Sequence, residues 1–196
     1  GPEAQSKQGY HTLSAIQVIQ PAIIASPRRR KPQVVKFLSA RQVEQDAPHA
    51  VKAGAIVIDN TNAFRMDPKV SLVVPEINRE DISKHQGIIA NPNCSAIIML
   101  MAIAPLHRKN RIKRIVCATY QSTSGAGSRA MQELEDQTRA YLEKKPLKIE
   151  AFPHQIAFNL FSHDSPISDG GYNEEELKVI QESKKILHDD RIQIGI

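Results

Sequence analysis

The chain has 196 residues, of which 41% are hydrophobic and 24% are charged, and its formal net charge is +5. This length allows one substantial hydrophobic core, or two smaller halves that share an interface. No apolar run approaches the roughly 20 residues that a membrane-spanning helix needs. The two cysteines are too few for a disulfide framework, so we expect a globular protein from a reducing compartment.

The positive charge is concentrated near the N-terminus. Residues 1–43 hold seven lysines and arginines against one acidic residue, whereas the rest of the chain holds 19 basic and 20 acidic residues. The basic run at 28–31 lies between prolines and has no interleaved aromatic residues, which favours a solvated loop over a nucleic-acid-binding surface. We therefore do not expect a nucleic-acid partner.

Residues 1–33 are predicted to be an irregular N-terminal segment. Its initial Gly-Pro has the form of a protease-cleavage scar or of the start of an incomplete chain. Nucleotide-binding βαβ units open with a glycine-rich turn whose backbone N–H groups hold the pyrophosphate. No G-x-G-x-x-G or G-x-x-G-x-x-G pattern occurs here or later in the chain.

The next segment alternates apolar runs with one helical pattern. Apolar runs bounded by polar residues are typical of parallel strands covered by helices, and Gly54 provides a helix stop. The predicted strands are 34–38, 54–60, 70–77 (interrupted by Pro75) and 88–90, and the predicted helix is 43–52.

A polar turn at 91–93 leads to Cys94, and an apolar run predicts a helix over 95–107 that is buried on nearly every side. Pro92 cannot lie inside a helix, so Cys94 falls at the helix N-terminus. Unpaired N–H groups and the helix dipole stabilise a thiolate and a developing oxyanion there. Cys94 is therefore a candidate nucleophile, although a lone cysteine is more often a small buried hydrophobe. Cys117, within a predicted strand, is interpreted as structural.

The rest of the chain has three further elements. We predict a strand within 112–120, a helix over 128–144, and a final helix that Asn173 caps and that runs to about residue 188. Three consecutive glutamates in the first turn of that helix favour its dipole. The histidines of the intervening stretch, His154 and His163, lack metal-ligand spacing and are interpreted as structural or surface residues.

Three motifs carry a resemblance to a known family. They are Asn-Cys-Ser at 93–95, Thr-Tyr-Gln at 119–121 and Ser-Gly-Ala-Gly at 124–127. The chain resembles aspartate-β-semialdehyde dehydrogenases from about residue 34 to about residue 190, and its later part is most similar to plant-type members. The resemblance implies an α/β fold: residues 34–92 as the remnant of a doubly wound, parallel NAD(P)-binding Rossmann-like domain, and residues 93–196 as part of an α+β catalytic and dimerisation domain.

The resemblance also implies roles for the residues around the cysteine. Cys94 would be the nucleophile and Gln121 would orient the acyl intermediate. The Asn93 side chain or the Cys94 backbone N–H would stabilise the oxyanion.

Asn60 and Arg65 match residues that bind phosphate, and a guanidinium suits this task because it meets two phosphate oxygens at once. Glu175 and Lys178 match residues that contact substrate and phosphate. From the residues alone, a surface ion pair between Arg65 and Asp67, and an i,i+3 ion pair between Glu175 and Lys178, remain alternatives.

The implied cofactor is NADP, with Ser39, Ser124 and Gly125 matching cofactor-contacting positions. Arg41 follows Ala40 where family members have glycine, and the glycine-rich turn is lacking, so we expect weak cofactor binding by this chain. Residues 190–196 also offer no equivalent of the family's substrate-binding arginine or general-base histidine.

The predicted activity is the NADP- and phosphate-dependent interconversion of L-aspartate 4-semialdehyde and L-4-aspartyl phosphate, in lysine, methionine and threonine biosynthesis. We expect this chain alone to be inactive or weakly active, to form a homodimer or homo-oligomer, and to lie in the cytoplasm or, in a plant or alga, in the plastid. The alternatives are a non-catalytic homologue that dimerises through 128–187 and an N-acetyl-glutamyl-phosphate reductase. The latter has glycine in place of Asn93.

Overall fold

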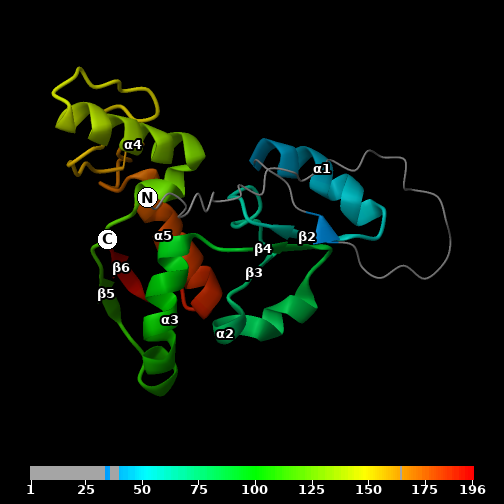
Figure 1. Cartoon of the computed structure of the whole chain (residues 1–196). Helices are drawn as coiled ribbons and strands as arrows, with labels where there is room; N and C mark the ends of the chain where they lie inside the picture. The colour runs from blue at the N-terminus through cyan, green and yellow to red at the C-terminus, as the bar shows by residue number, and fades with distance from the viewer. Residues whose placement is uncertain (1–33, 36–39, 164) are drawn as a thin grey trace, which may run out of the picture. The chain divides into compact units, whose positions relative to one another are not determined.

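The computed structural model describes residues 34–35, 40–163 and 165–196, which belong to one unit, residues 32–196. The predicted irregular segment 1–33 and the proposed cofactor residue Ser39 lie outside the described residues. The first half of this unit forms a four-stranded, fully parallel sheet in the order β1-β2-β4-β3 (Figure 1). Its strands are β1 Val34–Val35, β2 Ile56–Asp59, β3 Ser71–Leu72 and β4 Ile88–Ala90.

Helix α1, Ala40–Lys52, covers part of this sheet. Its buried residues Val43 and Ala47 form a small apolar cluster with Val57 of β2. The parallel sheet and the helix after β1 confirm the α/β fold expected from the alternating pattern. The division of the chain into two domains at residues 92 and 93 stays a prediction.

The predicted strand 70–77 is wrong beyond Leu72. Pro75 begins the short helix α2, Pro75–Asn78, which is followed by the 3₁₀ helix η2, Arg79–Lys84. Proline is favoured at the start of a helix, where its missing N–H costs no hydrogen bond. The buried Asn78 side chain fixes the change of direction, because it accepts the Val74 N–H at 2.9 Å and donates to the Leu72 carbonyl at 2.9 Å.

The second half contains three long helices and a second, two-stranded parallel sheet. The strand β6 pairs in parallel with β5 and was not anticipated from the sequence, while β5 is shorter than the predicted 112–120. None of the described helices is long and apolar enough to cross a membrane. The elements are α3 Cys94–Lys109, β5 Arg114–Val116, η3 Thr123–Ala126, α4 Ser128–Leu142, α5 Glu174–Leu187 and β6 Gln193–Gly195.

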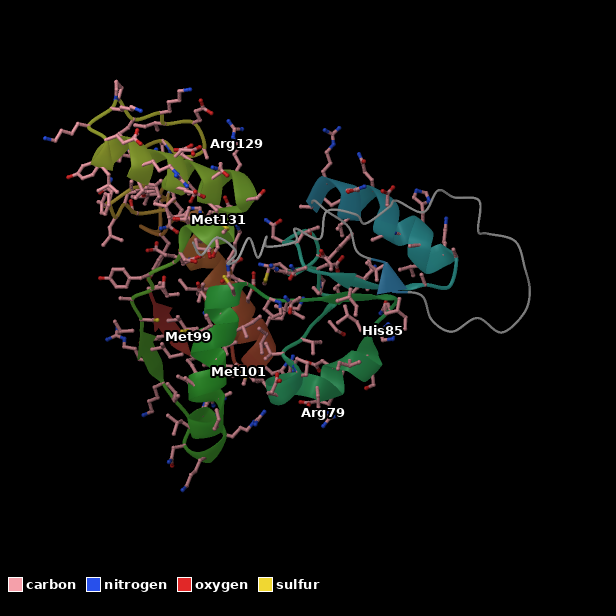
Figure 2. All side chains as sticks on the ribbon, in the orientation of Figure 1. Arg79, His85, Met99, Met101, Arg129 and Met131 are labelled. Atoms are coloured by element: carbon pink, nitrogen blue, oxygen red, sulfur yellow. The ribbon has the colours of Figure 1, made fainter. Side chains whose placement is uncertain are left out.

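One continuous core joins the larger sheet, α3, α5 and the smaller sheet. Met99 of α3 lies in this core, whereas Met101, two residues later on the same helix, is 43% exposed (Figure 2). Ile98 is 73% exposed, so the expectation that α3 is buried on nearly every side is wrong. Other described elements cover only one side of this apolar helix.

Candidate functional site

The turn before α3 places Cys94 at the start of that helix. Asn93 is the N-cap residue, and its Oδ1 accepts the backbone N–H groups of Ser95 at 2.8 Å and Ala96 at 3.2 Å. Cys94 is the first helical residue and is exposed. Its own N–H meets no acceptor among the described residues. The predicted position of Cys94 at the helix N-terminus is therefore confirmed. The alternative that Cys94 is a small buried hydrophobic residue is excluded.

Glu175, in the first turn of α5, connects the two other predicted residues beside the cysteine. Its Oε1 accepts Asn93 Nδ2 at 2.7 Å and Gln121 Nε2 at 3.1 Å. The start of α5 is itself fixed by a capping box, in which Asn173 and Glu176 exchange side-chain and backbone hydrogen bonds. Three predicted site residues that are 28 and 54 positions apart along the chain, Asn93, Gln121 and Glu175, are thus brought together.

Arg65 reaches the same helix two turns further on. Its Nη1 lies 3.1 Å from Glu182 Oε1, and the side chains of the two residues are only 11% and 1% exposed. Glu182 Oε2 accepts the backbone N–H of Asn93 at 2.6 Å. The alternative of a surface pair with Asp67 is therefore not what forms. Burial raises the pKa of Glu182, and the Asn93 N–H and the Arg65 charge oppose this rise.

Asn60 lies at the edge of the same group. Its side-chain Oδ1 accepts Asn91 Nδ2 at 2.7 Å, and its carbonyl accepts Arg65 Nη2 at 3.4 Å. Both asparagines follow neighbouring parallel strands, β2 and β4, so the sheet itself brings them to one edge. The predicted phosphate residues Asn60 and Arg65 are accordingly neighbours of the turn that carries Cys94.

Lys178 does not pair with Glu175. Its Nζ lies 2.7 Å from Glu174, one turn back on α5. The predicted contact of Lys178 with substrate and phosphate stays a prediction. The same holds for Glu175, whose carboxylate accepts hydrogen bonds from Asn93 and Gln121.

The predicted cofactor residues Ser124 and Gly125 lie in the exposed 3₁₀ helix η3. A Cβ atom at Gly125 would meet nothing within 4 Å, and the Ser122 and Ser124 hydroxyl groups are 2.6 Å apart. The predicted contact of Ser124 and Gly125 with a cofactor stays a prediction.

Glu182 and Lys185 were missed from the sequence. Lys185 Nζ donates to the carbonyl oxygens of Arg65 and Asp67, both at 2.7 Å. Burial lowers the pKa of Lys185, and the charges of Asp67 and Glu182 oppose this shift. The available signal was spacing: residues 175, 178, 182 and 185 are separated by three, four and three positions, which places four charged side chains on one side of a helix.

Comparisons with known proteins identify the family of the chain. Residues 31–85 match the family model for the semialdehyde dehydrogenase NAD binding domain, and residues 103–195 match that for the semialdehyde dehydrogenase dimerisation domain. Aspartate-semialdehyde dehydrogenase of Synechocystis sp. is 55% identical over 148 residues, which are 76% of this chain and 44% of the relative. The Bacillus subtilis enzyme is 48% identical over 156 residues, covering 76% of this chain and 45% of the relative. The chain belongs to the aspartate-semialdehyde dehydrogenase family.

A solved structure in the same family supports the fold. Aspartate semialdehyde dehydrogenase II from Vibrio cholerae superposes with a TM-score of 0.80 at 42% sequence identity, covering 83% of this chain and 49% of that one. The chain spans about half the length of the curated relatives it matches. These relatives do not favour either of the two alternatives raised from the sequence.

Proposed function

We propose that this chain carries the cysteine half-site of an NADP-dependent aspartate-semialdehyde dehydrogenase. The observation that carries the proposal is the convergence of Asn93, Gln121 and Arg65 on two carboxylates of α5, Glu175 and Glu182, beside an exposed cysteine at a helix N-terminus. The substrate pair would be L-aspartate 4-semialdehyde and L-4-aspartyl phosphate.

The proposed chemistry begins with the thiolate of Cys94 adding to the aldehyde carbon, which forms an S–C bond and an oxyanion. Ser124 and Gly125 would hold the nicotinamide end of NADP⁺, which would supply the acceptor for the hydride lost from this carbon. The product is a thioester on Cys94, a good acyl donor. Attack of a phosphate oxygen on the thioester carbonyl then breaks the S–C bond, releases the acyl phosphate and returns the thiolate.

The hydrogen bonds of the turn support one of the two groups that could stabilise the oxyanion. Asn93 Oδ1 is an acceptor already used by two N–H groups and cannot donate, and Nδ2 gives one of its two hydrogens to Glu175. The Cys94 backbone N–H has no such partner in the described residues and remains available. We therefore assign oxyanion stabilisation to the Cys94 N–H and assign to Asn93 the task of fixing the turn.

Arg65 would bind the attacking phosphate, with Asn60 beside it. Its Nε atom is buried without a hydrogen-bond partner, and Nη2 makes only a 3.4 Å contact, so Glu182 satisfies only part of the guanidinium. Gln121 would hold the acyl group against Cys94. Lys178 and Glu175 would contact substrate and phosphate, and Ser124 and Gly125 the nicotinamide end of the cofactor. Assembly as a homodimer would use the segment that matches the family's dimerisation domain.

The test combines turnover with direct labelling of the cysteine. NADPH formation from L-aspartate 4-semialdehyde, NADP⁺ and phosphate is measured for the chain and for Cys94→Ala, and iodoacetamide labelling is measured in a Cys117→Ala background. We expect Cys94 to be alkylated much faster than a cysteine in an unfolded peptide, with protection by the semialdehyde. Turnover that persists in Cys94→Ala, or labelling no faster than in the peptide, would contradict the proposal.

A further inference from the structure

Glu182 joins two parts of the site that are remote in sequence. One carboxylate oxygen accepts the Asn93 N–H, 89 residues away, and the other accepts Arg65 Nη1, 117 residues away. The side chain of Glu182 is 1% exposed. A single buried carboxylate therefore sets the distance between the turn that carries Cys94 and the guanidinium that would bind phosphate.

Lys185, one turn later on α5, holds the same arginine by its backbone. Its ammonium donates to the carbonyl oxygens of Arg65 and Asp67. Arg65 is therefore held at both ends: the guanidinium by Glu182 and the main chain by Lys185. Rotation of the Arg65 side chain is then limited by contacts with a single rigid helix.

Stability alone does not explain this arrangement. Removing a carboxylate and a guanidinium from water costs several kcal/mol per ion, and well-packed apolar residues often replace a buried ion pair without loss. The raised pKa of Glu182 shows that burial disfavours its charge here. The buried pair has a specific geometric effect instead, since the two oxygens of one carboxylate hold the Arg65 guanidinium and the Asn93 N–H.

We propose that Glu182 is a positioning residue that fixes Arg65 relative to Cys94. The inference rests on the proposed function, in which Arg65 binds the attacking phosphate. Glu182 contacts neither substrate nor cofactor in this account and acts through Arg65 and the Asn93 N–H.

The substitution Glu182→Gln tests the proposal because the carboxamide of glutamine has one acceptor oxygen, whereas the carboxylate has two. The oxygen can accept from the Asn93 N–H or from Arg65, and the NH₂ group must then face a donor. Glu133→Gln on α4 is the matched control. Glu133 is 8% exposed, accepts the backbone N–H groups of Glu150 and Ala151, and contacts none of the predicted site residues in the hydrogen bonds of the described chain.

Two readouts are measured on the full chain in a Cys117→Ala background. The first is backbone amide hydrogen exchange of residues 60–67 and 91–96 relative to residues 99–104 in the core of α3, a helix that carries neither substitution. The second is the concentration of inorganic phosphate that half-protects Cys94 from iodoacetamide. In Glu182→Gln we expect exchange in the two segments to accelerate, and the half-protecting concentration to rise, on the order of tenfold each. Glu133→Gln should change neither by more than about twofold.

Several results would overturn the proposal. Unchanged or tighter protection by phosphate in Glu182→Gln would mean that Glu182 competes with phosphate for Arg65. Acceleration spread evenly over the chain would show a structural role only. If phosphate gives no protection even before the substitution, the phosphate role of Arg65 fails, and the exchange comparison still decides whether Glu182 fixes the two segments.

Discussion

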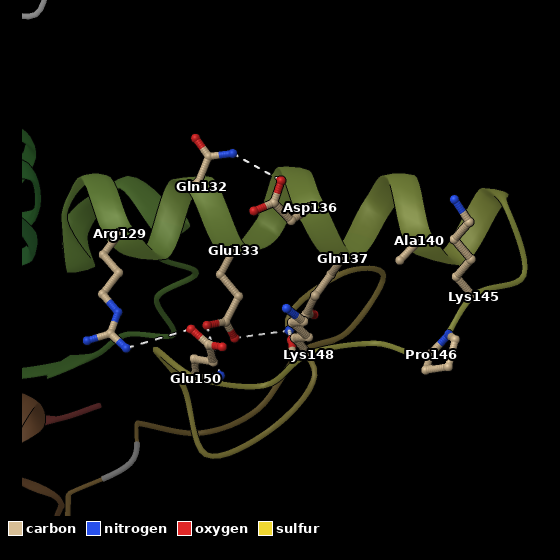
Figure 3. Close-up of a pocket in the computed structure, with 10 residues that line it drawn as sticks. All are labelled: Arg129, Gln132, Glu133, Asp136, Gln137, Ala140, Lys145, Pro146, Lys148 and Glu150. Atoms are coloured by element: carbon tan, nitrogen blue, oxygen red, sulfur yellow. Dashed lines mark hydrogen bonds and ion pairs between the residues drawn. The ribbon is translucent and has the colours of Figure 1, made fainter.

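The helices α4 and α5 each bury a glutamate, and they use it differently. On α4, Glu133 accepts backbone N–H groups of Glu150 and Ala151, and Gln137, one turn later, accepts those of Ile156 and Ala157. Figure 3 shows the side chains of Glu133 and Gln137 pointing from α4 toward the loop that follows it. These partners lie within 20 residues of the helix. The α4 glutamate therefore shapes the loop that follows its own helix.

On α5, Glu182 binds an arginine and the N–H before the candidate nucleophile, 117 and 89 residues earlier in the chain. A buried carboxylate therefore does not by itself indicate a functional site. The residues that it binds show whether it belongs to one. Cavity size is no better a guide. A cavity of about 420 Å³ lies beside α4 and is lined by Glu133 and Gln137, but none of the predicted site residues lines it (Figure 3).

The largest expected effect comes from removing Arg65, the cation that Glu182 of α5 binds. Arg65→Ala leaves the Glu182 carboxylate buried without its partner, so we expect the free energy of unfolding to fall by about 3 kcal/mol. Urea denaturation at pH 7 measures this. Arg129→Ala on α4 is the control, because Arg129 is 74% exposed and lies 3.9 Å from Glu150, and it should change stability little. Equal effects of the two substitutions would remove the distinction between the helices.

The C-terminal end of α5 gives the next largest expected effect. Burial alone would raise the pKa of Asp81, but hydrogen bonds from Lys84 and Asn78, together with His188 at 2.8 Å, lower it below its ordinary value of 3.8. The folded state therefore binds the proton more weakly, so this stabilisation is present above pH 3.8 and is lost as the pH falls through the folded pKa.

Asp81→Asn should lower the free energy of unfolding by about 2.5 kcal/mol at pH 7, because it removes charge-assisted hydrogen bonds from a buried group. The difference from the unsubstituted chain should shrink as the pH falls below 3.8. Urea midpoints at several pH values provide the measurement. A difference that stays constant with pH would show that the charge of Asp81 does not contribute.

The sequence carries the local features of the site better than the contacts between its parts. Pro92 and Asn93 place Cys94 at the start of a helix, and Asn173 with the three glutamates after it marks the start of α5, because caps and proline act within a few residues. By contrast, β3 ends early because Asn78 folds back on Leu72, and this depends on burial of the asparagine.

Glu182 shows most clearly why the rest was not predictable. A glutamate in an amphipathic helix is ordinarily solvent-exposed, and the spacing that puts Glu182 on the same side as Glu175 does not tell whether that side is buried. Its burial is decided by Arg65 and Asn93, which only the folded chain brings near. The exposed side of α3 is a similar case, since an apolar run does not reveal which of its sides the chain covers.

Glu133→Gln tests the other half of the comparison. The amide cannot accept from both the backbone N–H groups and Gln137, so we expect the free energy of unfolding to fall by about 1.5 kcal/mol. The iodoacetamide labelling rate of Cys94 should not change, because the partners of Glu133 lie in the loop after α4. A slower or faster labelling rate would mean that the two buried glutamates are coupled.

The smallest expected effect comes from the N-cap of α5. It tests whether Glu175, in the first turn, and Glu182, two turns later, act independently. Asn173→Ala removes the side-chain cap and half of the capping box, which should cost about 1 kcal/mol. Fraying would reach Glu175 in the first turn, while Glu182 lies two turns further along the helix. Amide exchange should therefore accelerate at the start of α5 and leave the Asn93 N–H, which Glu182 accepts, as protected as before. Loss of protection at Asn93 would show that Glu175 and Glu182 hold the cysteine turn as one unit. The position of Cys94 would then depend on the whole face of α5 and not on Glu182 alone.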